Sequence, residues 1–170
     1  MHHRPRLSAT AGTERTPGSR ATVALAGLGL ACAALSGCSS DGAGTAVSPA
    51  PRASDPACAQ ALAALPATVL GQARTPLAVG GAAAWGEPAI VLRCGLPELG
   101  PTRTGCQTVD DIDWVVDVSA DPATITTYGR SPALEVRIPR SYGQTSASDA
   151  AVDLAAVARA LPRTARACIG

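Results

Sequence analysis

The chain has 170 residues, a suitable length for one domain, and a formal charge of only +1. A nearly neutral chain lacks the basic surface that nucleic-acid binding requires, so we expect no nucleic-acid partner. The sequence contains no lysine, and its two histidines are His2 and His3, which excludes Schiff-base lysines and the phosphate-binding lysine of P-loop proteins.

Residues 1–37 have the order of a secretory signal peptide. Four arginines precede an uncharged, mostly apolar run, Ala21 to Leu35, which is shorter than the about 20 residues of a spanning helix. The tetrapeptide Leu35-Ser36-Gly37-Cys38 resembles the lipobox of bacterial lipoproteins, whose cysteine receives diacylglycerol and becomes the new N-terminus. We expect export, lipidation of Cys38 and a location at the extracytoplasmic face of the cell membrane. The alternative, a stretch of buried core helix, does not explain the position and the flanks of the run.

Removal of this leader changes the charge and the available chemistry. Four of the 14 basic residues and one of the 13 acids leave, so residues 38–170 carry a formal charge of −2. Both histidines leave as well, which excludes histidine-based acid–base catalysis from the mature chain.

Four cysteines remain for the exported domain: Cys58, Cys94, Cys106 and Cys168. An even number of thiols outside the cytoplasm predicts two disulfides, with three possible pairings. We favour Cys94 with Cys106, because the Gly- and Pro-rich loop between them must return on itself if the flanking strands pair. Cys58 with Cys168 would then join the two ends of the domain. A zinc site is the weaker alternative, since CxxC spacing and histidine are both absent, and we expect no metal.

Residues 38–54 are predicted to be a flexible tether, followed by a single domain at residues 55–170. The tether is small, polar and proline-bearing, with nothing to bury. The domain opens with Asp55-Pro56, a capping residue before proline at the first helical position. This pair predicts a helix that ends before Pro66.

The middle of the domain alternates between apolar and polar residues, which is typical of half-buried strands. The alternation is clearest where Ile112, Trp114 and Val116 are flanked by aspartates. Turn sequences at 119–122 and 129–132 join successive segments closely, which predicts an antiparallel meander. The predicted strands are 90–93, 111–118, 124–128 and 134–138.

A second helix is predicted at the C-terminal end. Ser148 is a suitable N-cap, and Leu154, Val157 and Leu161 form an apolar stripe that Pro162 ends. Two helices with apolar stripes and a sheet with one apolar face can bury both only by packing together. The predicted fold is therefore α+β, a small two-layer sandwich in which an antiparallel β-meander packs against an N-terminal and a C-terminal helix, with two disulfides.

Three phrases of the domain are similar to those of a known family: Ala84–Gly95 (AWGEPAIVLRCG), Asp113–Val116 (DWVV) and Thr127–Ala133 (TYGRSPA). Together with Cys58 and the Leu-Pro that follows it, they make residues 55–170 resemble the domain-of-unknown-function 3515 family. The resemblance implies an exported or lipid-anchored protein of high-GC Gram-positive bacteria. It implies no reaction, ligand or catalytic residue.

Candidate functional residues are few. Ser131 lies in a phrase similar to a nucleophile elbow, but no histidine or lysine is present to accept its proton, and a turn is favoured. Asp110, Asp111, Asp113 and Asp117 could ligate calcium, although their spacing is not that of an EF-hand and alternating acids usually form a solvated strand face.

Two further sets have competing interpretations. Arg159, Arg163 and Arg166 could bind an anionic envelope polymer, or could simply complement a helix dipole. Trp85 could face a ligand, but a core position is favoured for it, and Trp114 is expected in the core as well.

We expect a non-enzymatic, lipid-anchored envelope protein that binds an envelope protein or polymer, or supports assembly, and that needs no cofactor. The alternative is a glycan-acting hydrolase that uses only carboxylates. That function would require Glu135 or Asp117 to face another carboxylate across a cleft.

Overall fold

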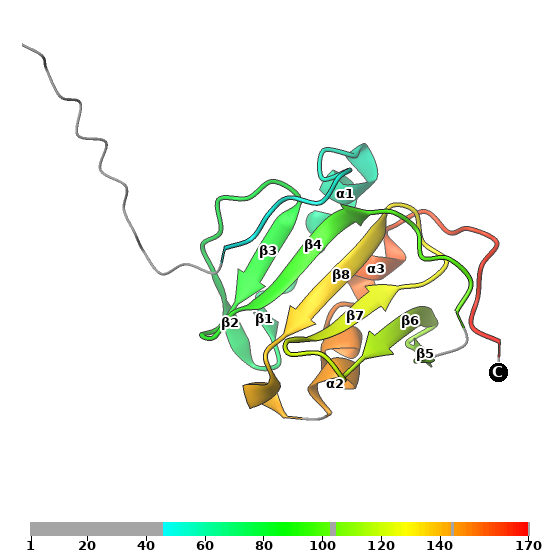
Figure 1. Ribbon diagram of the computed structural model, residues 1–170. Coiled ribbons are helices and arrows are strands. Elements are labelled where there is room, and N and C mark those ends of the chain that lie inside the picture. The colour runs from blue at the N-terminus through cyan, green and yellow to red at the C-terminus, as the bar shows by residue number, and fades with distance from the viewer. Residues whose placement is uncertain (1–45, 103–104, 144, 170) are drawn as a thin grey trace, which may run out of the picture. The chain divides into compact units, whose positions relative to one another are not determined.

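The computed structural model describes residues 46–102, 105–143 and 145–169. Cys38 and the leader lie outside these residues. In chain order, the described elements are α1 (Pro56–Leu62), β1 (Thr68–Val69), β2 (Gln72–Thr75), β3 (Ala82–Trp85), β4 (Ile90–Leu96), β5 (Cys106–Val109), β6 (Ile112–Asp117), β7 (Ala123–Thr127), β8 (Ala133–Ile138), the 3-10 helix η1 (Arg140–Tyr142), α2 (Ser146–Asp153) and α3 (Ala155–Arg159) (Figure 1). None of the helices in this described part of the chain is long and apolar enough to span a membrane.

The eight strands form one antiparallel sheet in the order β1-β2-β3-β4-β8-β7-β6-β5. β4 pairs with β3 on one side and with β8 on the other, so the chain leaves the middle of the sheet after β4 and re-enters at the edge as β5. The strands β5 to β8 then return to the middle as consecutive neighbours. The predicted antiparallel meander is confirmed for β6, β7 and β8, whereas β1, β2, β3 and β5 were not predicted.

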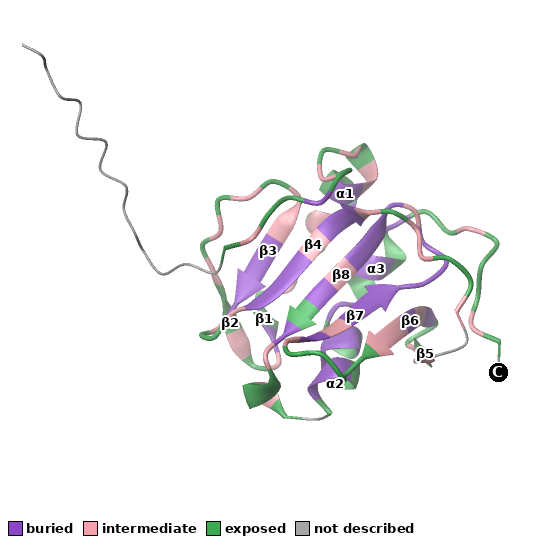
Figure 2. Cartoon of the chain, viewed as in Figure 1, coloured by how far each residue is buried: buried purple, intermediate pink, exposed green. Residues whose placement is uncertain are grey.

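The helices pack against one face of the sheet, and in Figure 1 the strands lie in front of α2 and α3. The alternation along each strand decides which side chains point toward the helices. On β4, Ile90 and Leu92 join the core, while Arg93 lies on the other face. Figure 2 shows the buried positions along the central strands and on the sheet-facing sides of the helices.

α1 begins where the sequence predicts. The Asp55 carboxylate accepts a hydrogen bond from the Ala57 N–H at 2.9 Å, and Pro56 is the first helical residue. The helix ends at Leu62, before Pro66. The predicted N-terminal helix is therefore confirmed.

The C-terminal helical region starts earlier than predicted and is divided. α2 begins at Ser146, so Ser148 lies inside the helix and is not its N-cap. Leu154, with φ −102° and ψ 4°, separates α2 from α3. The predicted apolar stripe is confirmed, because Leu154, Val157 and Leu161 are all buried.

The number of disulfides is as predicted, but the predicted pairing is wrong. The bridges are Cys58–Cys94 and Cys106–Cys168. A Cys94–Cys106 bridge needed β4 and β5 to be neighbours, yet β8, β7 and β6 lie between them. Cys94 belongs to the buried core instead, where it meets Cys58 of α1, and both residues are fully buried.

Residues 46–54, which we call the N-terminal segment, pack against the sheet. The Arg52 N–H donates to the Gly95 carbonyl of β4 at 2.9 Å, and Ala50 is only 6% exposed. Gly95 has a φ of +109°, and a Cβ there would collide with the backbone of Arg52 and Ala53. The prediction of a free, flexible tether is therefore wrong for this segment, and the folded domain starts before residue 55.

Candidate functional site

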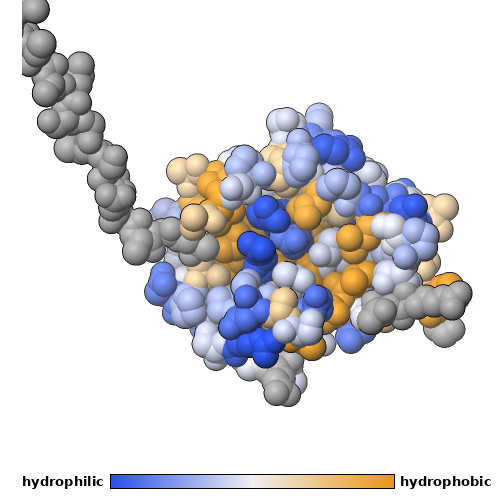
Figure 3. All heavy atoms as spheres, viewed as in Figure 1, coloured by the Kyte–Doolittle hydropathy of each residue, from blue (hydrophilic) through white to orange (hydrophobic). Residues whose placement is uncertain are grey.

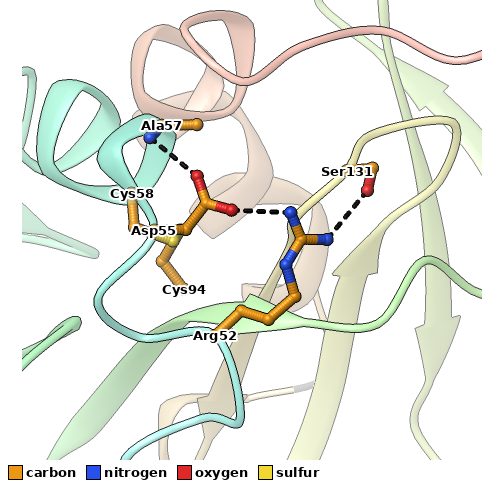
Figure 4. A network of polar contacts seen from close by, with 6 residues as sticks. All are labelled: Arg52, Asp55, Ala57, Cys58, Cys94 and Ser131. Carbon is orange, nitrogen blue, oxygen red and sulfur yellow. Dashed lines mark hydrogen bonds and ion pairs between the residues drawn. A yellow bond between two sulfur atoms is a disulfide. The ribbon is translucent and has the colours of Figure 1, made fainter.

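Ser131, the candidate nucleophile, belongs to a network of polar contacts (Figure 4). Its Oγ accepts a hydrogen bond from the Arg52 guanidinium at 3.1 Å, and the same guanidinium donates to the Asp55 carboxylate at 2.6 Å. The Ala57 N–H and then Arg52 hold the pKa of Asp55 below its ordinary value. Because the group beside the Ser131 hydroxyl is a permanent cation, it cannot take the hydroxyl proton. The network instead ties the N-terminal segment to α1 and to the β7–β8 turn, beside the Cys58–Cys94 disulfide.

Arg130, the neighbour of Ser131, has a structural position that the sequence did not reveal. It is 5% exposed and donates to the Leu161 carbonyl at 2.7 Å, just beyond the end of α3. Burial, with smaller contributions from Arg163 and Arg159, lowers its pKa. A guanidinium at this helix end satisfies a carbonyl that has no partner within the helix.

The favoured core position of Trp85 is confirmed, and its candidate ligand-facing role is wrong. Its side chain is fully buried, and its indole N–H donates to the Pro66 carbonyl at 3.2 Å. The alternation of β3 places Trp85 on the helix-covered face together with Ala83. Trp114 is fully buried in the core, as expected.

The aspartates around β6 serve local structure. Asp113 accepts hydrogen bonds from the Thr108 hydroxyl at 2.6 Å and from the Cys168 N–H at 2.9 Å. Asp117 accepts from the hydroxyl and the N–H of Ser119, which lower its pKa in that order of importance. Among the described residues there is no group of three His, Cys, Asp or Glu side chains that could hold a metal ion. The calcium interpretation therefore gains no support.

Two of the three C-terminal arginines have partners within the domain. Arg159 donates to the Asp110 carbonyl at 3.0 Å, and Arg166 forms an ion pair with Glu98 at 2.9 Å. Arg163 is exposed. Arg159 and Arg166 therefore have structural roles within the domain, and their contacts do not support an anion-binding patch.

The face of the sheet opposite the helices carries a charged cluster. Arg93 of β4 lies opposite Glu135 of β8 and donates to its carboxylate at 2.6 and 3.2 Å. Arg137, two positions further along β8, has its Nε 3.7 Å from the same carboxylate. Two guanidinium groups thus share one acid, which leaves an excess of one positive charge. Figure 3 shows hydrophilic residues near the middle of the viewed face, between hydrophobic ones.

A hollow of about 390 Å³ adjoins this cluster. Its walls come from residues 46–48 of the N-terminal segment, the β3–β4 turn with β4, the β6–β7 turn and the end of β8. Its charged lining residues are Arg93, Arg137 and Asp121, and most of the others are apolar. No sequence pattern marked this site, because its walls come from four segments that only the folded chain brings together.

A comparison with family models identifies the relatives of this chain. A model described as "Protein of unknown function (DUF3515)" matches residues 20–165. The chain belongs to the DUF3515 family. This confirms the resemblance noted in the sequence. For this DUF3515 protein, no match was found among curated proteins or solved structures.

Two of the sequence phrases that carried the DUF3515 resemblance contain the residues whose contacts are described above. The phrase Ala84–Gly95 forms the end of β3, the β3–β4 turn and most of β4, so it supplies Trp85 to the core and Arg93 to the opposite face. The phrase Thr127–Ala133 forms the β7–β8 turn, with the Arg130 and Ser131 contacts. In this DUF3515 chain, the resemblance therefore rests largely on residues that build the sheet and its connections.

Proposed function

We propose that this protein is a non-enzymatic binding or assembly module, lipid-anchored through Cys38 at the outer face of the cell membrane. The leader and the Leu35-Ser36-Gly37-Cys38 phrase support the anchor. The two disulfides also suit a domain that folds in an oxidising compartment.

The observation that carries the binding role is the charged cluster beside the hollow, on the sheet face opposite the helices. A concave site with mostly apolar walls and a few convergent polar groups is the usual form of a ligand site. Here Arg93, Arg137 and Asp121 supply the polar groups of such a site. The partner expected from the sequence is an envelope protein or polymer.

The placement of the other reactive groups favours binding over catalysis. The Ser131 hydroxyl lies beside the Arg52 guanidinium, so it has a cation where an acyl-transfer enzyme needs a base. The two-carboxylate alternative needs acids that face each other. Glu135 instead lies between Arg93 and Thr126 on the neighbouring strands.

Photo-cross-linking in intact membranes tests the proposal. A photoreactive amino acid at Thr124, which lies beside Arg137 on the face opposite the helices, should cross-link to a defined envelope component. The control position is Val152 of α2, which is 52% exposed and should give no cross-link to it. Equal cross-linking from both positions, or none from Thr124, would contradict the binding role. Loss of cellular function in Asp117→Asn with an unchanged melting temperature would favour the hydrolase, because Asp117 does not line the hollow.

A further inference from the structure

The two arginines that line the hollow differ in how their donors are used. Arg93 makes two hydrogen bonds to Glu135 and a third, at 3.4 Å, to the Ser48 carbonyl. The Arg137 side chain is 51% exposed, and its only ion pair with a described residue is the 3.7 Å approach to Glu135. No hydrogen bond joins the Arg137 guanidinium to any described residue, so its donors are available to a ligand.

We infer that the hollow binds a small organic carboxylate with an apolar body, and that the carboxylate is held by Arg137. This inference rests on the proposed binding function and names the class of ligand that the site would take.

The charges around the hollow favour a monoanion. Glu135 offsets the charge of Arg93, with which it makes the shorter contacts. Arg137 then remains as the cation for a ligand, while Asp121, which also lines the hollow, repels additional negative charge. A guanidinium presents two parallel N–H donors that match the two oxygens of a carboxylate. Phosphate, whose charge near neutral pH lies between −1 and −2, fits this balance less well.

The walls favour an apolar ligand body. Three prolines, Pro88, Pro122 and Pro139, line the hollow together with Ala89 and Val91. An exposed ion pair contributes little by itself, so contact with these walls has to supply much of the affinity. Each methylene that is buried should improve binding about fourfold.

The test uses the full lipoprotein extracted from membranes in detergent, and the probe is 4-methylpentanoate. Binding is followed through the guanidinium Nε–H signals in ¹⁵N NMR spectra, which localise it to individual arginines. We expect the Arg137 signal to shift with saturation. We also expect at least tenfold weaker binding of acetate, which lacks the apolar body, and of 4-methylpentanamide, which lacks the charge.

Matched variants distinguish binding at this site from nonspecific electrostatic binding of an anion to exposed arginines. Arg137→Gln should weaken binding of the probe at least tenfold. Arg137→Lys keeps the charge but not the planar guanidinium, so its affinity for the probe should lie between those of Arg137→Gln and the parent. Arg74→Gln, at an exposed position on β2, should bind as the parent does.

Any of four results would contradict the site. The Arg137 signal could show no saturable shift, or Arg137→Gln could bind the probe as the parent does. The amide or inorganic phosphate could also bind as tightly as 4-methylpentanoate. If cross-linking from Thr124 succeeded while the carboxylate failed, the ligand class would be wrong and the binding function would stand. Failure of both would remove the binding function as well.

Discussion

Trp85 and Trp114 are both fully buried, but their indole N–H groups differ in hydrogen bonding. Trp85 donates to the Pro66 carbonyl at 3.2 Å. The indole nitrogen of Trp114 has no hydrogen-bond partner among the described residues. An unpaired buried donor costs about 1–3 kcal/mol relative to a paired one. The two tryptophans are therefore expected to contribute unequally to stability, although both fill the core.

We predict that Trp85→Phe destabilises the protein by about 1–2 kcal/mol more than Trp114→Phe does. Both changes remove the same atoms from the core, but the first breaks a hydrogen bond and the second removes an unpaired donor. Urea unfolding of the two variants, with disulfides intact, measures the difference. Equal losses, or a larger loss in Trp114→Phe, would show that the Trp114 N–H is satisfied after all.

Two carboxylates, those of Asp55 and Asp117, have pKa values below the ordinary range. The cause is the Ala57 N–H, then Arg52, for Asp55, and the Ser119 hydroxyl, then its N–H, for Asp117. The folded state therefore binds fewer protons than the unfolded state in acid. The stabilisation is present above the ordinary aspartate pKa of about 4 and is lost as the pH falls through the folded-state pKa.

We predict that Asp55→Asn reduces the loss of melting temperature between pH 5 and pH 2. Asparagine still caps α1, but it does not titrate. Melting curves across this range measure the effect. Asp111→Asn is the control, because the Asp111 carboxylate accepts no hydrogen bond from the described residues, and it should follow the parent. An Asp55→Asn profile that is parallel to the parent would contradict the assignment.

At the scale of elements, the two disulfides differ in burial more than in loop length. They close 36 and 62 residues of chain, and loop-closure entropy gives about 4 kcal/mol for either. Cys58 of α1 and Cys94 of β4 are fully buried, whereas Cys106 and Cys168 are half-buried at the edge formed by β5. Packing and accessibility therefore distinguish the bridges.

We predict that mild reduction opens Cys106–Cys168 first, and that Cys58 and Cys94 become reactive only when the domain unfolds. Differential alkylation followed by a peptide map measures the order. The double variant Cys58→Ala with Cys94→Ala should also lose more stability than Cys106→Ala with Cys168→Ala, because it removes buried sulfur atoms from the core. A map with a Cys58–Cys168 peptide would contradict the pairing itself.

The strands show how far local patterns reach. Residues 111–118 and 134–138 predicted β6 and β8, because successive residues in each segment alternate between apolar and polar. β3 was missed because three of its four residues are alanine, which gives no clear alternation. β1 has only two residues. Short or alanine-rich strands are fixed by their partners in the sheet and not by their own composition.

For the whole molecule, the predicted lipid anchor decides where the domain acts. We predict that Cys38→Ala moves the protein from the membrane fraction to the soluble fraction, because it removes the acceptor of the lipid. Washed membranes, prepared without detergent and probed for the protein, measure the partition. Cys32→Ala changes the cysteine within the leader and should leave the protein membrane-bound. Full retention of Cys38→Ala in the membranes would contradict the lipobox interpretation.

The sequence by itself determined the family, the start of α1, four of the strands, the apolar stripe of the C-terminal helices and the presence of two disulfides. Capping and alternation depend on residues a few positions apart, so they can be recognised without knowing the fold. The tertiary structure alone decided the disulfide pairing, the packing of residues 46–54 and the hollow beside Arg137. Each of these depends on which distant segments become neighbours, and the insertion of β8 beside β4 settled that order.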